Sequence, residues 1–101
     1  MSVESRLDVS PERIAAFCRR HRIQSLGVFG SVLRDDFRPD SDVDLLVEFA
    51  PDAEIGFMAL SRMRRELSEL LGRSVDLVPR RGLKPQIRAS VLSDAEILYA
   101  A

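Results

Sequence analysis

Apolar and polar side chains alternate regularly from Val43 to Phe49. The odd-numbered positions are all apolar, whereas the even-numbered positions, counted from Asp42, hold two aspartates, a leucine and a glutamate. Because successive side chains of a strand point to opposite faces, the segment presents one apolar face and one largely polar face. The pattern therefore predicts a strand with one face in the core and a second face that carries Asp42, Asp44 and Glu48.

Other apolar patterns predict the remaining strands and helices. Further strands are expected at residues 26–30, 74–78 and 95–99. Helices are expected from Ser10-Pro11 to the basic residues 19–22, over residues 54–71, and over residues 84–92. Strands that alternate with helices indicate an α/β (α+β) architecture, a sheet of about four strands packed with helices. At 101 residues, the chain is expected to form a single domain over residues 1–101.

Local signals refine these helices. Ser10 supplies a hydroxyl at the N-cap of the first helix. Gly72 follows the second helix as a C-terminal stop. The methionines of that helix are interpreted as core filler, and its arginines as part of a solvated side. Those arginines are Arg62, Arg64 and Arg65.

Charge and composition narrow the classes of function. Fifteen basic residues stand against sixteen acidic ones, so the bulk positive charge of a protein that binds polymeric nucleic acid is missing. Cys18 is the single cysteine, which excludes an intrachain disulfide, and the N-terminus lacks the pattern of a signal peptide. No apolar run approaches the roughly 20 residues that span a bilayer. We expect a cytoplasmic protein that binds neither a membrane nor polymeric nucleic acid.

The aspartates are the first candidate site residues. Asp42 and Asp44 lie two residues apart on one strand face, which separates them by about 6.6 Å. Asp76 lies on the polar face of the strand expected at residues 74–78 and would join them if the two strands are neighbours. Like charges about 4 Å apart repel by about 4 kcal/mol at an effective dielectric constant of 20. Either protonation or a cation such as Mg²⁺, which binds oxygen ligands, would relieve this repulsion.

Gly30-Ser31 supplies the second half of a candidate site. Glycine at the end of a strand lets the backbone approach a ligand closely, and a following helix N-terminus would bind anions. Ser31 adds a hydroxyl. The two halves together indicate a polyphosphate held at the Gly-Ser turn and bridged by metal to the aspartates, as in two-metal sites that stabilise the attacking and leaving oxygens of an in-line displacement.

These residues resemble a known signature. Gly30-Ser31, a gap of ten residues, Asp42-Val43-Asp44 at the start of a strand, and Asp76 within "VDLV" are similar to the signature of the DNA polymerase β-like nucleotidyltransferase superfamily. Within it, "FGSVLRDDFRPDSDVDLLVEF" resembles the minimal nucleotidyltransferase (MNT) family, small prokaryotic proteins encoded beside a HEPN-domain ribonuclease toxin. The resemblance implies the nucleotidyltransferase fold, with a small mixed β-sheet.

The resemblance also implies roles for the carboxylates. Asp42 and Asp44 match the two metal-binding carboxylates of the family. Asp76 matches the third, which helps to bind the catalytic metal and can accept the proton of the attacking hydroxyl. The alternatives are an ordinary turn at Ser41-Asp42 and exposed strand positions without chemistry for Asp44 and Asp76.

In the loop, the resemblance assigns nucleotide binding to three residues. Gly30 and Ser31 match the turn that holds the terminal phosphates of the nucleotide. Arg34 matches a basic position of the MNT motif, where it either contacts phosphate or braces the loop. The alternatives are a simple strand-ending turn at Gly30 and a surface salt bridge at Arg34. Asp35 departs from the family, because many relatives have glycine there.

The function expected from the resemblance is a Mg²⁺-dependent nucleotidyltransferase that uses two metal ions and transfers AMP from ATP to a hydroxyl. The acceptor is expected on a partner, the HEPN toxin, which makes this chain a protein adenylyltransferase and an antitoxin. One alternative is a non-catalytic module that neutralises a toxin by contact. Another is a stand-alone nucleotidyltransferase that acts on a small molecule or an RNA end. A homo-oligomer or a hetero-oligomer is compatible with these functions.

Overall fold

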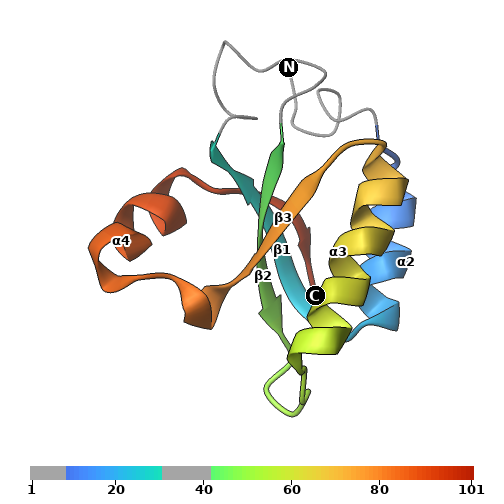
Figure 1. Cartoon of the computed structure of the whole chain (residues 1–101), viewed down its shortest axis with the longest axis horizontal. Coiled ribbons are helices and arrows are strands. Elements are labelled where there is room, and N and C mark those ends of the chain that lie inside the picture. The colour runs from blue at the N-terminus through green and yellow to red at the C-terminus, as the bar shows by residue number, and fades with distance from the viewer. Residues whose placement is uncertain (1–8, 31–41) are drawn as a thin grey trace.

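A computed structural model describes residues 9–30 and 42–101 (Figure 1). It confirms the expected α/β architecture, with each predicted strand and helix present, although the first strand begins at Ile23 and not at Leu26. The elements are α2 (Pro11–Arg20), β1 (Ile23–Phe29), β2 (Val43–Phe49), α3 (Phe57–Leu71), β3 (Val75–Pro79), the 3₁₀ turn η2 (Arg80–Gly82), α4 (Pro85–Asp94) and β4 (Glu96–Ala100). Within the described ranges, none of the helices combines the length and the apolar character that crossing a membrane requires.

The strands form one mixed sheet in the order β3-β2-β1-β4. β1 runs antiparallel to both β2 and β4, whereas β2 and β3 run parallel. The two parallel crossovers, β2-α3-β3 and β3-α4-β4, proceed in opposite directions across the sheet. Right-handed connections then place α3 and α4 on opposite faces. Figure 1 shows this arrangement, with α2 and α3 on one side of the sheet and α4 on the other.

The core lies between the sheet and the layer of α2 and α3. The apolar face predicted for β2 is buried here: Val43, Leu45 and Val47 are fully buried, and Phe49 at the end of the strand is half-buried. α2 and α3 contribute apolar side chains at helical spacing to the core: Ile14, Phe17, Cys18, Met63, Leu67 and Leu71. The polar face of β2 consequently lies on the far side of the sheet from this layer.

Two local expectations were wrong at helix starts. Ser10 occupies the N-cap position, but its hydroxyl donates to a carboxylate oxygen of Glu12 at 2.6 Å and does not cap the backbone. α3 begins at Phe57 rather than at Glu54, because the turn after β2 and the extended backbone of Gly56 occupy the preceding residues. The hydrophobic pattern extends through Ile55, which packs against the core without being helical.

The interpretation of the α3 methionines as core filler holds for one of the two. Met63 is 2% exposed, whereas Met58, in the first turn of the helix, is 76% exposed. The C-terminal stop at Gly72 is confirmed, with a left-handed backbone (φ 69°) and its N–H donating to the carbonyl of Ser68.

A polar bridge joins the C-terminal end of α2 to α3. Glu66 accepts from Arg20 at 2.6 Å and contacts His21 Nε2 at 3.2 Å. Burial alone would raise the pKa of Glu66, but the hydrogen bond and charge of His21 and then those of Arg20 lower it overall. His21, the single histidine of the chain, therefore contributes to helix packing at some distance from the carboxylate strands.

The buried face of β2 makes a first testable prediction. Replacement of Leu45, which is fully buried, by alanine is expected to lower the free energy of unfolding by about 2–5 kcal/mol, because it leaves a cavity. The control is Ile97→Ala on β4, where the side chain is 62% exposed and the loss is expected to stay below about 0.5 kcal/mol. Urea unfolding of both variants measures the difference, and similar losses would contradict the assignment of the core.

The single cysteine makes a second prediction. Burial raises the pKa of Cys18 to about 12 although nearby Arg19 lowers it, so the folded chain holds the thiol protonated. This preference stabilises the fold below the ordinary thiol pKa of about 8.5 and is lost as the pH rises toward the raised value. At pH 8, a disulfide reagent such as DTNB is expected to label Cys18 only as fast as the chain unfolds, and fully in urea. Stoichiometric labelling within seconds with the circular dichroism spectrum unchanged would contradict this burial.

Candidate active site

The parallel pairing of β2 and β3 brings two predicted site residues together. Asp44 and Asp76 are direct partners in the register, flanked by Val43 with Val75 and Leu45 with Leu77. Neighbouring strands lie about 4.8 Å apart, and residues in register project from the same face. Since Val75 and Leu77 are buried, Asp76 projects from the opposite face, as Asp44 does. The two strands are therefore neighbours, which was the condition for Asp76 to lie beside Asp44.

Gly30 approaches the same point from β1. Its backbone is left-handed (φ 77°), and Phe29 pairs with Asp44 across the β1–β2 ladder. A Cβ atom built on Gly30 would clash with a carboxylate oxygen of Asp44 and lie 3.2 Å from its Cγ. Glycine is therefore needed for two reasons: the positive φ and the close approach of its backbone to Asp44. The predicted partners of Gly30 in the loop, Ser31 and Arg34, and also Asp35, lie outside the described residues.

The chemistry of the donors suits Mg²⁺. Asp42 precedes β2 and is exposed, Asp44 is half-buried, and Asp76 is exposed. In residues 9–30 and 42–101, no three acidic, histidine or cysteine side chains converge closely enough to form a metal site on their own. Mg²⁺ commonly takes one or two carboxylates and completes its octahedron with water and substrate phosphates. Asp44 and Asp76, adjacent in the register of β2 and β3, supply two such carboxylates.

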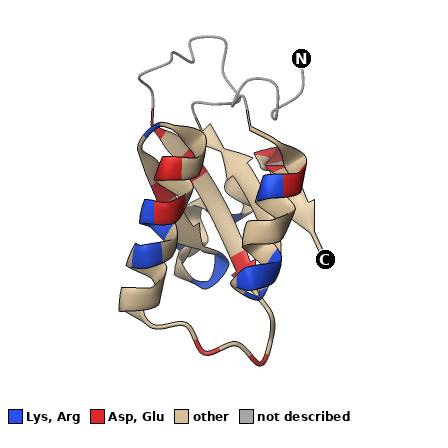
Figure 2. Cartoon of the chain, turned by 90° about the vertical axis from the view of Figure 1, so that its right-hand side faces the viewer, with Lys and Arg blue, Asp and Glu red and all other residues tan. Residues whose placement is uncertain are grey.

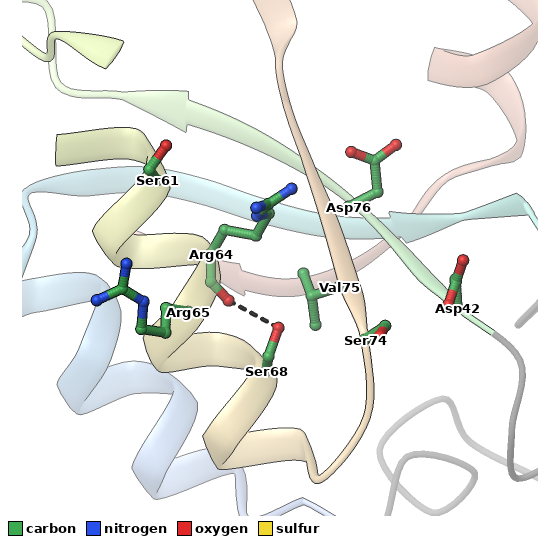
Figure 3. Close-up of a pocket in the computed structure, with 8 residues that line it drawn as sticks. All are labelled: Asp42, Ser61, Arg64, Arg65, Ser68, Ser74, Val75 and Asp76. Atoms are coloured by element: carbon green, nitrogen blue, oxygen red, sulfur yellow. Dashed lines mark hydrogen bonds between the residues drawn. The ribbon is translucent and has the colours of Figure 1, made fainter. Parts of the chain in front are cut away.

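A groove along β3 is lined by Asp42 and Asp76 and extends to α3. Its volume is about 570 Å³, and we refer to it as the α3–β3 groove. The residues that line it come from α3, β3 and the segments before β2 and β3: Asp42, Ser61, Arg64, Arg65, Ser68, Ser74, Val75 and Asp76. Figure 3 shows the Arg64 side chain extending from α3 toward β3, whereas that of Arg65 extends away from the strand.

The α3–β3 groove includes residues that the sequence did not assign to a site. Arg64 and Arg65 are exposed, as expected, yet they line the groove that contains two of the predicted carboxylates. The sequence feature that could have indicated these groove residues is the spacing of Ser61, Arg64 and Ser68, which places a stripe of polar side chains along one side of the helix. Only the packing of α3 beside β3 shows which segment this stripe faces.

Charges of both signs are mixed on the helical layer. Figure 2 shows basic and acidic segments intermingled along α2 and α3, without a face of a single sign. The basic residues of the α3–β3 groove lie beside the acidic residues Asp42 and Asp76. Such a surface suits a ligand that carries an anion next to a bound cation.

Comparison with known proteins assigns the family. Residues 12–98 match the family described as "Nucleotidyltransferase domain". The protein adenylyltransferase MntA of Thermococcus cleftensis is 38% identical over 80 residues, which are 79% of this chain and 77% of that protein. The solved structure of a candidate minimal nucleotidyltransferase is 40% identical, with a TM-score of 0.74 and 95% of each chain covered.

A further structure shares the fold. It is a chain of a complex from Shewanella oneidensis, described as a tri-AMPylated HEPN toxin with an MNT antitoxin. That chain is 20% identical, with a TM-score of 0.66, and the likeness covers 90% of this chain and 70% of that one. From the family match over residues 12–98 and from relatives that are themselves adenylyltransferases, we conclude that this chain belongs to the nucleotidyltransferase domain family, resembles its minimal members, and is an enzyme of that class.

Proposed function

We propose that this chain transfers AMP from ATP to a hydroxyl of a partner protein in the cytoplasm. The proposed partner is an HEPN-domain ribonuclease toxin, which would make this chain the antitoxin of the pair. The observation that carries the proposal is the register of Asp44 with Asp76, together with the close approach of Gly30 to Asp44. The protein adenylyltransferase among the relatives and the AMPylated HEPN toxin in the solved complex support the choice of nucleotide and acceptor.

Three carboxylates would carry out the chemistry. Asp42, Asp44 and Asp76 would hold Mg²⁺ only together with the nucleotide phosphates, and the bound metal would supply the positive charge that stabilises the attacking and leaving oxygens. The oxygen of the acceptor hydroxyl would form a bond to the α-phosphorus of ATP while Asp76 accepts the hydroxyl proton. The bond between the α-phosphorus and the oxygen that bridges to the β-phosphate would break, and pyrophosphate would leave with the electron pair of that bond.

The Gly-Ser turn would position the nucleotide. In this proposal, Gly30 and Ser31 hold the terminal phosphates beside Asp44, so that the leaving pyrophosphate lies on the β1 side of the carboxylates. Arg34 either contacts a phosphate or braces the loop. Positioning and electrostatic stabilisation supply most of the catalysis in phosphoryl and nucleotidyl transfer, because the protein forms no covalent bond to the substrate.

Substitution of the carboxylates tests the proposal. The double variant Asp42→Asn, Asp44→Asn is expected to lower transfer at least about a hundredfold, because it removes both charges that would hold the metal. The purified chain and the proposed HEPN partner are incubated with ATP and Mg²⁺, and intact mass spectrometry measures the gain of AMP-sized units on the partner.

A matched control lies on the same strand face. Glu48 pairs with Arg80 at 2.9 Å and lies toward the other end of β2, so Glu48→Gln is expected to retain transfer. If the unaltered pair gains no mass under these conditions, the enzymatic proposal is wrong. If the double variant silences the toxin without labelling it, neutralisation works by contact and not by AMP transfer.

Gly30 provides a separate prediction. Gly30→Ala is expected to lower transfer at least tenfold, because the new Cβ displaces the Asp44 carboxylate. Gly72→Ala is the control: its φ of 69° imposes a similar backbone strain of about 1–2 kcal/mol, but its Cβ would meet no atom within 4 Å. Thermal unfolding and the transfer assay are measured on both variants. Equal activity at equal stability would contradict the contact between Gly30 and Asp44.

A further inference from the structure

We propose that the α3–β3 groove receives the acceptor protein, and that Arg64 binds an acidic side chain next to the hydroxyl that is modified. This inference rests on the proposed function and adds to it the place of the acceptor and the chemistry that selects it. The groove is bordered by Asp76, the residue proposed to accept the hydroxyl proton, and it is about 570 Å³ in volume. That volume accommodates a few side chains of a docking segment.

The order of the strands gives the direction of attack. Gly30 at the end of β1 lies against Asp44 on β2, and Asp76 follows on β3. If pyrophosphate leaves over the β1 side, an in-line displacement requires the hydroxyl to arrive from the opposite side. β3 forms that edge of the sheet, and the α3–β3 groove lies directly beside it. The acceptor is therefore placed in the groove and the nucleotide phosphates at the Gly-Ser turn.

Among the charged residues of the groove, Arg64 indicates an acidic residue in the acceptor segment, because the two acidic residues, Asp42 and Asp76, are proposed metal ligands. Arg64 extends toward β3 (Figure 3), and among the described residues no ion pair joins its guanidinium to a carboxylate. A guanidinium presents paired N–H donors that match a carboxylate in a bidentate contact. Ser61 and Ser74 add hydroxyl groups to the lining. An acidic residue close to the modified hydroxyl would thus bind Arg64 while the hydroxyl faces Asp76.

The outer edge of β3 favours a polypeptide as the occupant. Among residues 9–30 and 42–101, β3 pairs with β2 alone, so in this part of the chain its outer backbone N–H and C=O groups face no other strand and could pair with an extended segment. Backbone pairing would give affinity for a chain of any sequence, and Arg64 would add the preference for an acidic one. A nucleotide alone would use neither the strand edge nor the length of the polar stripe from Ser61 to Ser68.

The test compares two arginines of the same helix. Arg64→Gln removes a charge from the α3–β3 groove, whereas Arg62→Gln removes the same charge from an exposed position that does not line it. The dissociation constant for the HEPN protein is measured with the chain bound to Mg²⁺ and AMP-PNP, which prevents turnover. The Michaelis constant for the HEPN protein is then measured with ATP, and ATP affinity is measured without the partner.

We expect Arg64→Gln to weaken binding of the HEPN protein about tenfold and to raise its Michaelis constant similarly, with ATP affinity unchanged. Arg62→Gln is expected to change none of these. Equal partner binding by the two variants would overturn the inference, and so would a loss of ATP affinity in Arg64→Gln, which would assign the groove to the nucleotide. If the unaltered chain leaves the HEPN protein unlabelled, the proposed function fails, and the binding comparison alone decides the role of the groove.

Discussion

The parallel pairing of β2 with β3 is the constraint on which the candidate site depends. Its register sets Asp44 beside Asp76, and the burial of the flanking apolar residues fixes the face from which both project. A shift of one residue would turn one carboxylate into the core, at a cost that the fold does not tolerate. The hydrophobic core thus holds Asp44 and Asp76 as neighbours on the other face of the sheet, where in the proposed function a cation would offset the repulsion between their carboxylates. In this way, the packing of one face of the sheet determines the chemistry of the other.

Much of this arrangement was predictable because it rests on local patterns. The alternation from Val43 to Phe49 predicted β2 with its observed bounds, and the isolated polar position of Asp76 predicted the face from which it projects. Gly30 was assigned to a close approach of backbone to a ligand, and the structure shows that its backbone also lies against Asp44. Strand pairing depends on contacts between residues far apart in the sequence. From the sequence, Asp76 could therefore be placed beside the other aspartates only if the two strands proved to be neighbours.

The remaining features depend on how elements pack, which local patterns do not encode. Arg64 was assigned to the solvated side of its helix, because a helical pattern predicts only whether a side chain is exposed. Arg64 also lines a groove, because α3 packs beside β3. Met58 was assigned to the core because apolar residues at helical spacing usually lie there, but α3 begins only one residue before it, and its side chain is left exposed. Ser10 is a residue type that commonly caps helices, yet its hydroxyl donates a hydrogen bond to the carboxylate of Glu12, two residues away, and not to the helix backbone.

The central claim is that a divalent cation binds where β1, β2 and β3 meet at Gly30, Asp44 and Asp76. The most direct measurement is the paramagnetic broadening of backbone amide signals when Mn²⁺ replaces Mg²⁺ in the presence of AMP-PNP. The account predicts strong broadening at the start of β2 and β3 and at Gly30, and little at Phe49 or Glu66. Broadening centred on the acidic residues of α3, or spread evenly over the surface, would contradict it.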